Sequence, residues 1–308
     1  MKGWVYKSTG SWYQLGTEDG EMFSARIKGK FKIDGITSTN PLAVGDVVDF
    51  EKEGDDDNTV VIHHIHERKN YITRQSPHNR HQHHIVAANL DQSLLLATLL
   101  EPKTSTGFID RFLVASEAYH VPAIIVFNKT DLFGKKEEAK YEEIQHMYEN
   151  AGYRVMRMSV ANNTGIDAIK ELLTNKTTLI SGHSGVGKSS FINTILPELS
   201  IKTQLVSDWS GKGLHTTTFA EMYDLPQGGR IIDTPGMREF ALMDIEPVEL
   251  SHYFTEMKER IHGCKFNNCM HIEEPGCAIK KAVEEGAISP IRYVSYLNIL
   301  SSIESKKW

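Results

Sequence analysis

One stretch in the middle of the chain has the residue types and spacing of a phosphate-binding loop. The pattern G-x-x-x-x-G-K-[ST] is matched at every fixed position by Gly182-His183-Ser184-Gly185-Val186-Gly187-Lys188-Ser189. Residues 177–181 before the loop are typical of a short buried strand, and residues 190–196 after it are typical of a helix. Strand, glycine loop and helix in this order predict a nucleotide site.

The chemistry of such a loop is the holding of phosphate groups. Glycines let successive backbone N–H groups turn toward phosphate oxygens, and the helix N-terminus adds partial positive charge. We expect Lys188 to contact the β- and γ-phosphates, Ser189 to hold Mg²⁺ through its hydroxyl, and Ser190 to lie beside them. A chance glycine turn before a helix is the less favoured interpretation.

A second pattern indicates which base is bound. Apolar residues 121–127 lead into Asn128-Lys129-Thr130-Asp131, so N-K-x-D lies at the carboxyl end of a predicted buried strand, where α/β sheets bind ligands. A carboxylate accepts hydrogen bonds from the ring N–H and exocyclic amine of guanine, a donor pair that adenine lacks. Asp131 therefore predicts a guanine nucleotide, although this motif alone also fits a polar strand-to-helix turn. Ser159 and Val160 occupy the expected place of a loop that touches guanine by its backbone, with Val160 where alanine is usual.

A third pattern concerns Mg²⁺ and the γ-phosphate. Asp233-Thr234-Pro235-Gly236 follows a predicted strand at residues 229–232 and matches D-x-x-G. We expect Asp233 to act near Mg²⁺ and the Gly236 N–H to contact the γ-phosphate. Motifs for phosphate, base and Mg²⁺, each at a strand end, together predict a guanine-nucleotide site.

The segment between these motifs is typical of a switch loop. In residues 207–219, small residues precede the run Leu214-His215-Thr216-Thr217-Thr218. We expect Thr216 and Thr217 at the nucleotide, with the Thr217 hydroxyl completing the Mg²⁺ shell when GTP is bound. The alternative is a threonine-rich start of the strand predicted at residues 220–225.

The predicted catalytic set is Lys188, His215 and Asp233. Met237 follows Gly236, so the glutamine that orients water in other GTPases is missing there. His215 is our candidate for that role, because a neutral imidazole can hydrogen-bond water; alternatively, His215 only anchors the loop. In either case we expect slow hydrolysis until a partner orders the switch.

The order of the motifs differs from that of Ras-like domains, which run P-loop, D-x-x-G and then N-K-x-D. Here Asn128–Asp131 precedes the P-loop, and Asp233–Gly236 comes last. The same sheet can form if the chain is cut and rejoined elsewhere, so we predict a circular permutation. The D-x-x-G switch then leads directly into the C-terminal region, to which it can transmit movement.

All the cysteines of the chain lie in one short pattern, C-x₄-C-x-H-x₅-C, formed by Cys264, Cys269, His271 and Cys277. Three thiolates and an imidazole form a closed tetrahedral shell, which predicts one structural zinc ion with no position for catalytic water. An odd, clustered set of 3 cysteines argues against a disulfide framework and for a reduced compartment. Incidental cysteines are the alternative.

Composition limits the remaining choices. The 308 residues suffice for two or three domains, and a net charge of −6 excludes a global basic field for nucleic acid. The sequence contains no apolar run of about eighteen residues, so we expect no membrane span. Met1-Lys2-Gly3-Trp4 does not open a long apolar signal segment.

Residues 1–67 have the pattern of a small β-barrel. Short, partly alternating strands are predicted at residues 3–6, 12–15, 22–27, 46–51 and 60–63, with Gly, Asp and Asn turns between them. Five such strands suit an OB-fold, a class that often binds RNA. Residues 26–32 are locally basic with an aromatic residue, so they could contact a phosphate backbone or form a solvated hairpin.

Residues 68–84 are predicted to be a polar linker before a GTPase domain at 85–243 and a mostly helical zinc-binding domain at 244–308. His78, His81, His83 and His84 could bind a metal. They have no patterned partner set, so a solvated linker is favoured over a metal site.

Together these patterns resemble one family, the circularly permuted GTPases of small-subunit ribosome assembly known as RsgA or YjeQ. Besides the motifs above, the resemblance rests on residues 89–92, 107–113, 213–218, 228–236, Glu274-Pro275-Gly276-Cys277, Arg292-Tyr293 and Ser295-Tyr296. It implies a multidomain α/β protein with an OB-fold barrel, a permuted P-loop GTPase domain and a zinc domain. Leu214, where a basic residue is more usual, and the acidic barrel depart from the family pattern.

The resemblance also implies a cytoplasmic enzyme that hydrolyses GTP, binds the 30S subunit and its 16S rRNA late in maturation, and leaves after hydrolysis. We expect a monomer that uses GTP or GDP, Mg²⁺ and one zinc. Two other functions fit the residues alone. The histidine-rich segment suits a GTP-dependent metallochaperone, and the missing glutamine suits a GTP-binding scaffold with negligible turnover.

Overall fold

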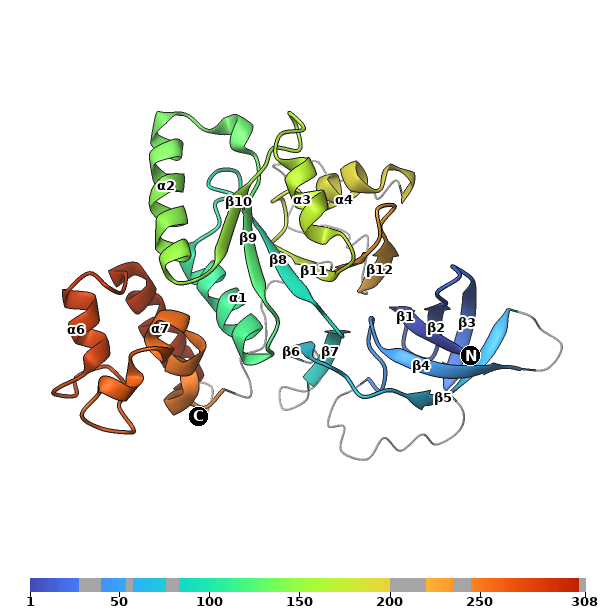
Figure 1. The fold of residues 1–308 in the computed structure, drawn as a ribbon, viewed down its shortest axis with the longest axis horizontal. Helices are drawn as coiled ribbons and strands as arrows, with labels where there is room; N and C mark the ends of the chain where they lie inside the picture. Colours follow the sequence, from blue (N-terminus) through green and yellow to red (C-terminus); the bar gives the residue numbers. More distant parts are fainter. Residues whose placement is uncertain (28–39, 54–57, 76–82, 200–219, 235–244, 305–308) are drawn as a thin grey trace, which may run out of the picture.

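The computed structural model describes residues 1–27, 40–53, 58–75, 83–199, 220–234 and 245–304. A barrel of β1 to β5 forms one end of the molecule, a twisted sheet flanked by helices lies in the middle, and a group of helices forms the other end (Figure 1). Among the described residues, no helix is long and apolar enough to cross a bilayer.

The N-terminal strands close into a barrel, as the sequence predicts. They are β1 Lys2–Ser8, β2 Tyr13–Gly16, β3 Met22–Ile27, β4 Val47–Lys52 and β5 Thr59–Ile65. The pairing order is β1-β2-β3-β5-β4, and β4 pairs back onto β1; only β3 and β5 are parallel. Inward residues such as Leu15, Phe50 and Ile62 fill the barrel core.

The central sheet has the order β10-β9-β8-β11-β13-β12, and all its neighbours are parallel except β12 and β13. Its strands are β8 Gln92–Ala97, β9 Ala123–Phe127, β10 Arg154–Arg157, β11 Thr177–Ser181, β12 Glu221–Asp224 and β13 Arg230–Asp233. Every residue of β8 and β9 is buried, because helices cover both faces of the sheet.

The covering helices divide between the two faces. One face packs against α1 Thr106–Ala118 and α2 Lys135–Asn150, and the other packs against α3 Ile166–Leu173 and α4 Lys188–Ile195. Leu95 and Phe127 point to the first face, whereas Leu96 and Val126 point to the second, as the two-residue period of a strand requires. The short helices η1 Thr130–Leu132 and η2 Pro197–Leu199 complete this part.

The barrel continues the central sheet through one pairing, Lys7 opposite Glu221, whose side chains form an ion pair at 3.0 Å. Strands β6 Tyr71–Gln75 and β7 His83–Ala88 pair separately. β6 and the start of β7 lie within residues 68–84, where we expected a solvated linker. Ile72 of β6 is buried in the core that also contains α1, so β6 is held by packing.

The C-terminal region is mostly helical, as predicted. It consists of η3 Pro247–Tyr253, α5 Thr255–Lys258, η4 Ile261–Gly263, α6 Ala278–Glu284 and α7 Pro290–Glu304. Its apolar residues, including Phe254, Tyr296 and Ile299, join the core that lies under α1. This region is therefore packed against the first face of the central domain.

Candidate nucleotide site and metal centre

The glycine loop lies at the carboxyl end of β11, in the middle of the sheet. Gly182 and Gly187 have φ values of 144° and 98°. A Cβ on Gly182 would lie 2.5 Å from the Leu96 carbonyl oxygen, and one on Gly187 would lie 2.4 Å from Asn128 Nδ2. Both positions therefore need glycine for conformation and for space.

Lys188 and Asp233 meet beneath this loop. Lys188 begins α4 and donates from Nζ to the Gly182 carbonyl at 2.8 Å. Asp233 ends β13 opposite Ile180 of β11, and it is only 7% exposed. Burial raises the pKa of Asp233, which Lys188 opposes; burial likewise lowers the pKa of Lys188, which Asp233 opposes.

The donor set at this point fits Mg²⁺. Asp233 Oδ1 is buried and has no hydrogen-bond partner among the described residues. Such a carboxylate oxygen is costly to bury unless a cation or donor compensates it. Ser189, in the first turn of α4, offers a hydroxyl from the adjacent strand-loop-helix unit. A carboxylate and a hydroxyl are the hard oxygen ligands that Mg²⁺ prefers.

Asn128 connects the P-loop to the loop after β10. Its Nδ2 donates to the Val186 carbonyl at 2.9 Å, and its Oδ1 accepts from the Val160 N–H at 3.3 Å. Because Asn128 is buried and both of its polar atoms are used, its side chain ties the two loops together. This strut accounts for an asparagine at the first position of N-K-x-D.

The remaining residues of that motif lie beside the same loop. Asp131 is exposed and accepts from Ser159 Oγ, while Thr130 Oγ1 donates to the Met158 carbonyl at 3.0 Å. Lys129 is left-handed, with φ of 63°, and its Nζ donates to the Glu101 carbonyl. The base-reading carboxylate is thus positioned by a serine, although its role toward guanine stays a prediction.

The sequence did not indicate one contact of the P-loop, which the structure shows. His183 Nε2 is 2.8 Å from Thr104 Oγ1, and the ring of Phe108 packs edge-on against the His183 ring. The segment after β8 therefore supports the P-loop from the side. Residues 107–113 belong to the family pattern, but their spacing does not indicate which loop they touch.

Four predicted site residues lie outside the described part of the chain: His215, Thr216, Thr217 and Gly236. Within it, Ser184 is exposed, whereas Ser189 and Ser190 are half-buried at the start of α4. The structure thus brings together the P-loop, Asn128–Asp131, Ser159, Val160 and Asp233 at one edge of the sheet.

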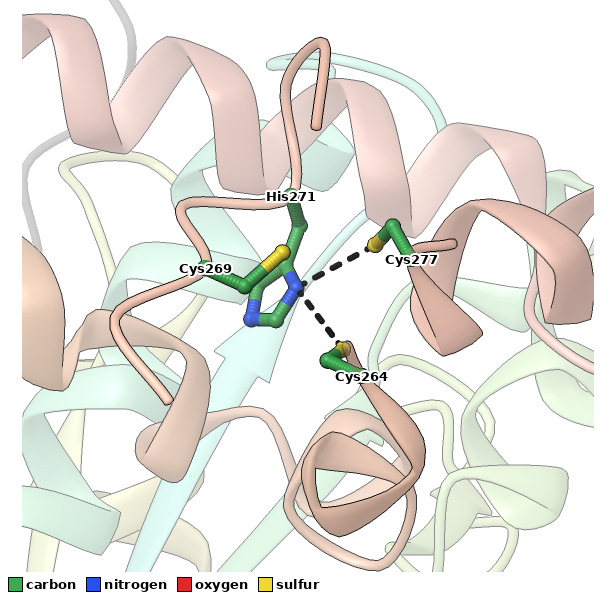
Figure 2. Close-up of side chains that lie close together, drawn as sticks. All are labelled: Cys264, Cys269, His271 and Cys277. Carbon is green, nitrogen blue, oxygen red and sulfur yellow. Dashed lines mark hydrogen bonds between the residues drawn. The ribbon is translucent and has the colours of Figure 1, made fainter. Parts of the chain in front are cut away.

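The four predicted zinc ligands also converge (Figure 2). His271 Nδ1 lies 3.6 Å from Cys264 Sγ and 3.4 Å from Cys277 Sγ, and the ligand atoms of all four residues are within 4.8 Å of one another. Bonds of about 2.0–2.3 Å to zinc would separate tetrahedral ligand atoms by roughly 3.5–3.8 Å. The cluster therefore fits zinc in both donor chemistry and size.

The surroundings hold this cluster in shape. His271 is 2% exposed and left-handed, with φ of 59°, and its carbonyl accepts from Tyr293 Oη at 2.5 Å. The Glu274 carboxylate accepts from the Met270 and Ile272 N–H groups at 2.7 and 2.8 Å. Burial raises the pKa of Cys269 to about 12, so zinc binding would have to displace its proton.

A buried ion-pair cluster joins the C-terminal region to the central domain. Arg292 of α7 is 1% exposed; its Nη1 donates to Asp110 Oδ1 at 2.6 Å, and its Nε and Nη2 donate to Glu256 at 2.7 and 3.0 Å. Tyr148 Oη also donates to Asp110, at 2.9 Å. Four elements, α1, α2, α5 and α7, therefore meet at this cluster.

The chain is similar to known proteins along nearly its whole length. The RsgA N-terminal domain model matches residues 2–60, and the RsgA GTPase model matches residues 65–243. A small ribosomal subunit biogenesis GTPase RsgA from Flavobacterium johnsoniae is 52% identical over 305 residues, covering 99% of this chain and 94% of that protein. One from Bacteroides fragilis is 49% identical over 310 residues, covering 100% and 99%.

Solved structures show the same architecture. YjeQ from Thermotoga maritima matches with a TM-score of 0.79 and 33% identity, covering 98% of each chain. YloQ, described as a circularly permuted GTPase, matches with a TM-score of 0.75 and 30% identity, covering 99% of this chain and 95% of that one.

Proposed function

This chain belongs to the RsgA family of circularly permuted GTPases, and on that premise we propose that it hydrolyses GTP to GDP and phosphate during late maturation of the 30S ribosomal subunit. Relatives about half identical over the whole chain are named as small ribosomal subunit biogenesis GTPases. The 30S subunit, through its 16S rRNA, is the proposed partner and activator. The protein would act as a cytoplasmic monomer.

The proposed mechanism assigns phosphate binding to the P-loop. Backbone N–H groups of residues 182–188 and the ammonium of Lys188 hold the β- and γ-phosphates. Ser189, Thr217 and Asp233 would hold Mg²⁺, which when bound neutralises charge on these phosphates. Asp131 selects guanine, Asn128 keeps the base-side loop against the P-loop, and Ser159 and Val160 approach the base by their backbone.

Water positioning is assigned to His215, because the residue after Gly236 is Met237. A loop that must be ordered before it positions water makes hydrolysis depend on a partner. Asp233 lies in the motif that precedes the C-terminal region, whose first described helix, η3, begins at Pro247. A change at the γ-phosphate would therefore be transmitted to the zinc-binding region, and one structural zinc would keep that region folded.

The observation that carries the proposal is the convergence of phosphate, base and Mg²⁺ residues at one sheet edge through Asn128 and Asp233. Its test is GTP hydrolysis by the purified protein alone, with 30S subunits and with 50S subunits. We expect slow turnover alone and a large rise with 30S only. Equal rates in all three assays would remove the ribosomal part of the proposal and favour a scaffold or metallochaperone.

A further inference from the structure

A second cluster of metal-ligating side chains lies on the outside of the barrel, far along the chain from the cysteine cluster. It consists of Asp49, His64 and His66, whose ligand atoms all lie within 4.8 Å of one another. Asp49 is on β4, His64 is on the neighbouring β5, and His66 follows β5 directly. The nucleotide site and the cysteine cluster use none of these residues.

A β-bulge creates this arrangement. Phe50 pairs with Ile62, but the next pair is Asp49 with His64, so His63 is the extra residue on β5. The inserted residue reverses the alternation beyond it: Ile62 points into the barrel core, and His64 lies on the outer face opposite Asp49. His66, two residues on, lies on that same face.

The side chains are close enough to share one ion. His66 Nε2 lies 3.1 Å from Asp49 Oδ2, and the rings of His64 and His66 are edge-on with centroids 4.9 Å apart. His66 Nε2 is itself buried and has no hydrogen-bond partner of adequate geometry among the described residues. The His66 N–H donates to the Val47 carbonyl at 2.9 Å, which fixes the backbone beneath the ring.

We propose that Asp49, His64 and His66 form a second metal site, selective for a divalent first-row transition metal such as zinc or cobalt. Two imidazoles with one carboxylate suit these ions, whereas Mg²⁺ and Ca²⁺ prefer oxygen ligands alone. A plain ion pair between protonated His66 and Asp49 would account for the 3.1 Å approach but would give His64 no part.

Three protein ligands leave positions of the ion open, unlike the closed set of three cysteines and His271. The site is partly exposed and its ligands are harder, so it binds more weakly than the cysteine cluster and exchanges its ion. The surrounding residues 1–67 are acidic, and a bound dication adds local positive charge to the outer face of β4 and β5.

The test is titration of the zinc-loaded full-length protein with Co²⁺, in excess Mg²⁺ and without nucleotide. Calorimetry counts the ions bound, and the visible spectrum separates nitrogen and oxygen ligation from the thiolate-to-cobalt charge transfer of the cysteine cluster. We expect one further equivalent of Co²⁺ without thiolate bands. His64→Ala, His66→Ala and Asp49→Asn should each weaken it by at least about tenfold.

Two matched controls keep the assignment specific. His63→Ala changes a neighbouring histidine whose Nε2 faces Glu51 at 3.6 Å, and the affinity for the further Co²⁺ should be unchanged. Replacing His78, His81, His83 and His84 with alanine should also leave it intact. The site is overturned if wild-type protein binds no further Co²⁺, or if the binding survives in the His64→Ala/His66→Ala double variant.

Unaltered GTP hydrolysis in these variants, none of which touches the nucleotide site, will show that the chain remains folded.

Discussion

Gly187 is constrained by two neighbours at once. Its φ of 98° disfavours other residues, and its Cα faces Asn128 Nδ2 so closely that no side-chain atom fits between them. The same asparagine holds the Val186 carbonyl. Because Gly187 has no side chain, Asn128 can approach the P-loop closely enough to hold it against the base-side motif.

Gly187→Ala should consequently weaken nucleotide binding. Backbone strain of about 1–3 kcal/mol at this position corresponds to roughly a 5- to 150-fold loss of GDP affinity. Fluorescent-GDP titration measures it. Gly107→Ala is the matched control, because a Cβ at Gly107 meets nothing within 4 Å. Equal affinity in both variants would contradict the close-approach argument.

Asp131 is exposed, and its carboxylate is oriented by a hydrogen bond from Ser159 Oγ. An asparagine oxygen at this position can accept the same hydrogen bond. Asp131→Asn should lower GTP affinity by roughly two orders of magnitude and favour xanthosine triphosphate, because an amide donor matches the xanthine carbonyl. Competition between the two nucleotides is the measurement. An unchanged preference for GTP would exclude Asp131 from base reading.

His215 lies outside the described residues, so its assignment rests on the sequence. His215→Ala should leave GTP affinity unchanged and slow 30S-stimulated hydrolysis by about 100-fold, the lower end of what a positioned acid–base group contributes. Single-turnover hydrolysis with 30S subunits separates these effects. If stimulation survives, His215 only anchors its loop.

At the scale of elements, the central sheet positions the site because the carboxyl ends of its parallel strands share one edge. Asp233 is level with Ile180 in the β11–β13 pairing, and Asn128 follows β9 directly. The P-loop strand β11 lies between β8 and β13, so motifs far apart in the chain become neighbours.

The Arg292 cluster fixes the positions of four helices relative to one another, as the sheet does for the site residues. Its charges are almost wholly removed from water: Arg292 donates to both Glu256 and Asp110 Oδ1, and its Cζ lies 4.6 Å from the centroid of the Phe254 ring. Burial raises the pKa of Asp110, and Arg292 opposes that shift. Removal of one charged partner would leave the opposite charge buried without compensation. The resulting loss of stability is larger than the net contribution of the intact ion pair.

Arg292→Met should therefore reduce the free energy of unfolding by about 3–5 kcal/mol. Urea denaturation followed by circular dichroism measures this loss. Arg111→Met is the matched control on α1: its Nη2 donates to the neutral Ser302 Oγ at 3.0 Å, and this partly exposed hydrogen bond contributes at most about 1.5 kcal/mol. Similar losses in both variants would show that the buried cluster has no special role.

At the scale of the whole molecule, three parts are linked by different physical means. The barrel extends the sheet through the pairing of Lys7 with Glu221, and Tyr6 Oη donates to Asp224 at 2.7 Å. The C-terminal helices dock through an apolar core and the Arg292 cluster. The described residues of the nucleotide site all belong to the central part, so we expect the site to form without the flanking parts.

Loss of zinc should therefore unfold the zinc-binding region and leave the nucleotide site intact. Cys277→Ser removes a proposed zinc ligand, buried at the N-terminus of α6, and should unfold residues 264–284 while GDP affinity is retained. Limited proteolysis and zinc release report the unfolding, and fluorescent-GDP binding reports the site. Loss of both together would mean that the nucleotide site depends on the zinc region.

The sequence by itself determined the local units and their chemistry. The P-loop, N-K-x-D, the cysteine pattern and most strands could be read from it, since each depends on residue types at short, fixed spacing. The strand expected at 177–181 is β11 Thr177–Ser181, and the five barrel strands lie where alternation predicts them. The order of the parts could also be read from the residues, whereas the ribosomal partner came only from the family resemblance.

Only the tertiary structure decided which of these units touch. Asn128 to Val186, Arg292 to Asp110 and His183 to Thr104 are contacts between residues 58, 182 and 79 positions apart. The bulge at His63 is a matter of pairing register, which composition does not encode, and so the sequence did not indicate that Asp49, His64 and His66 come together. Long-range contacts depend on how strands and helices pack, and local spacing carries little information about that packing.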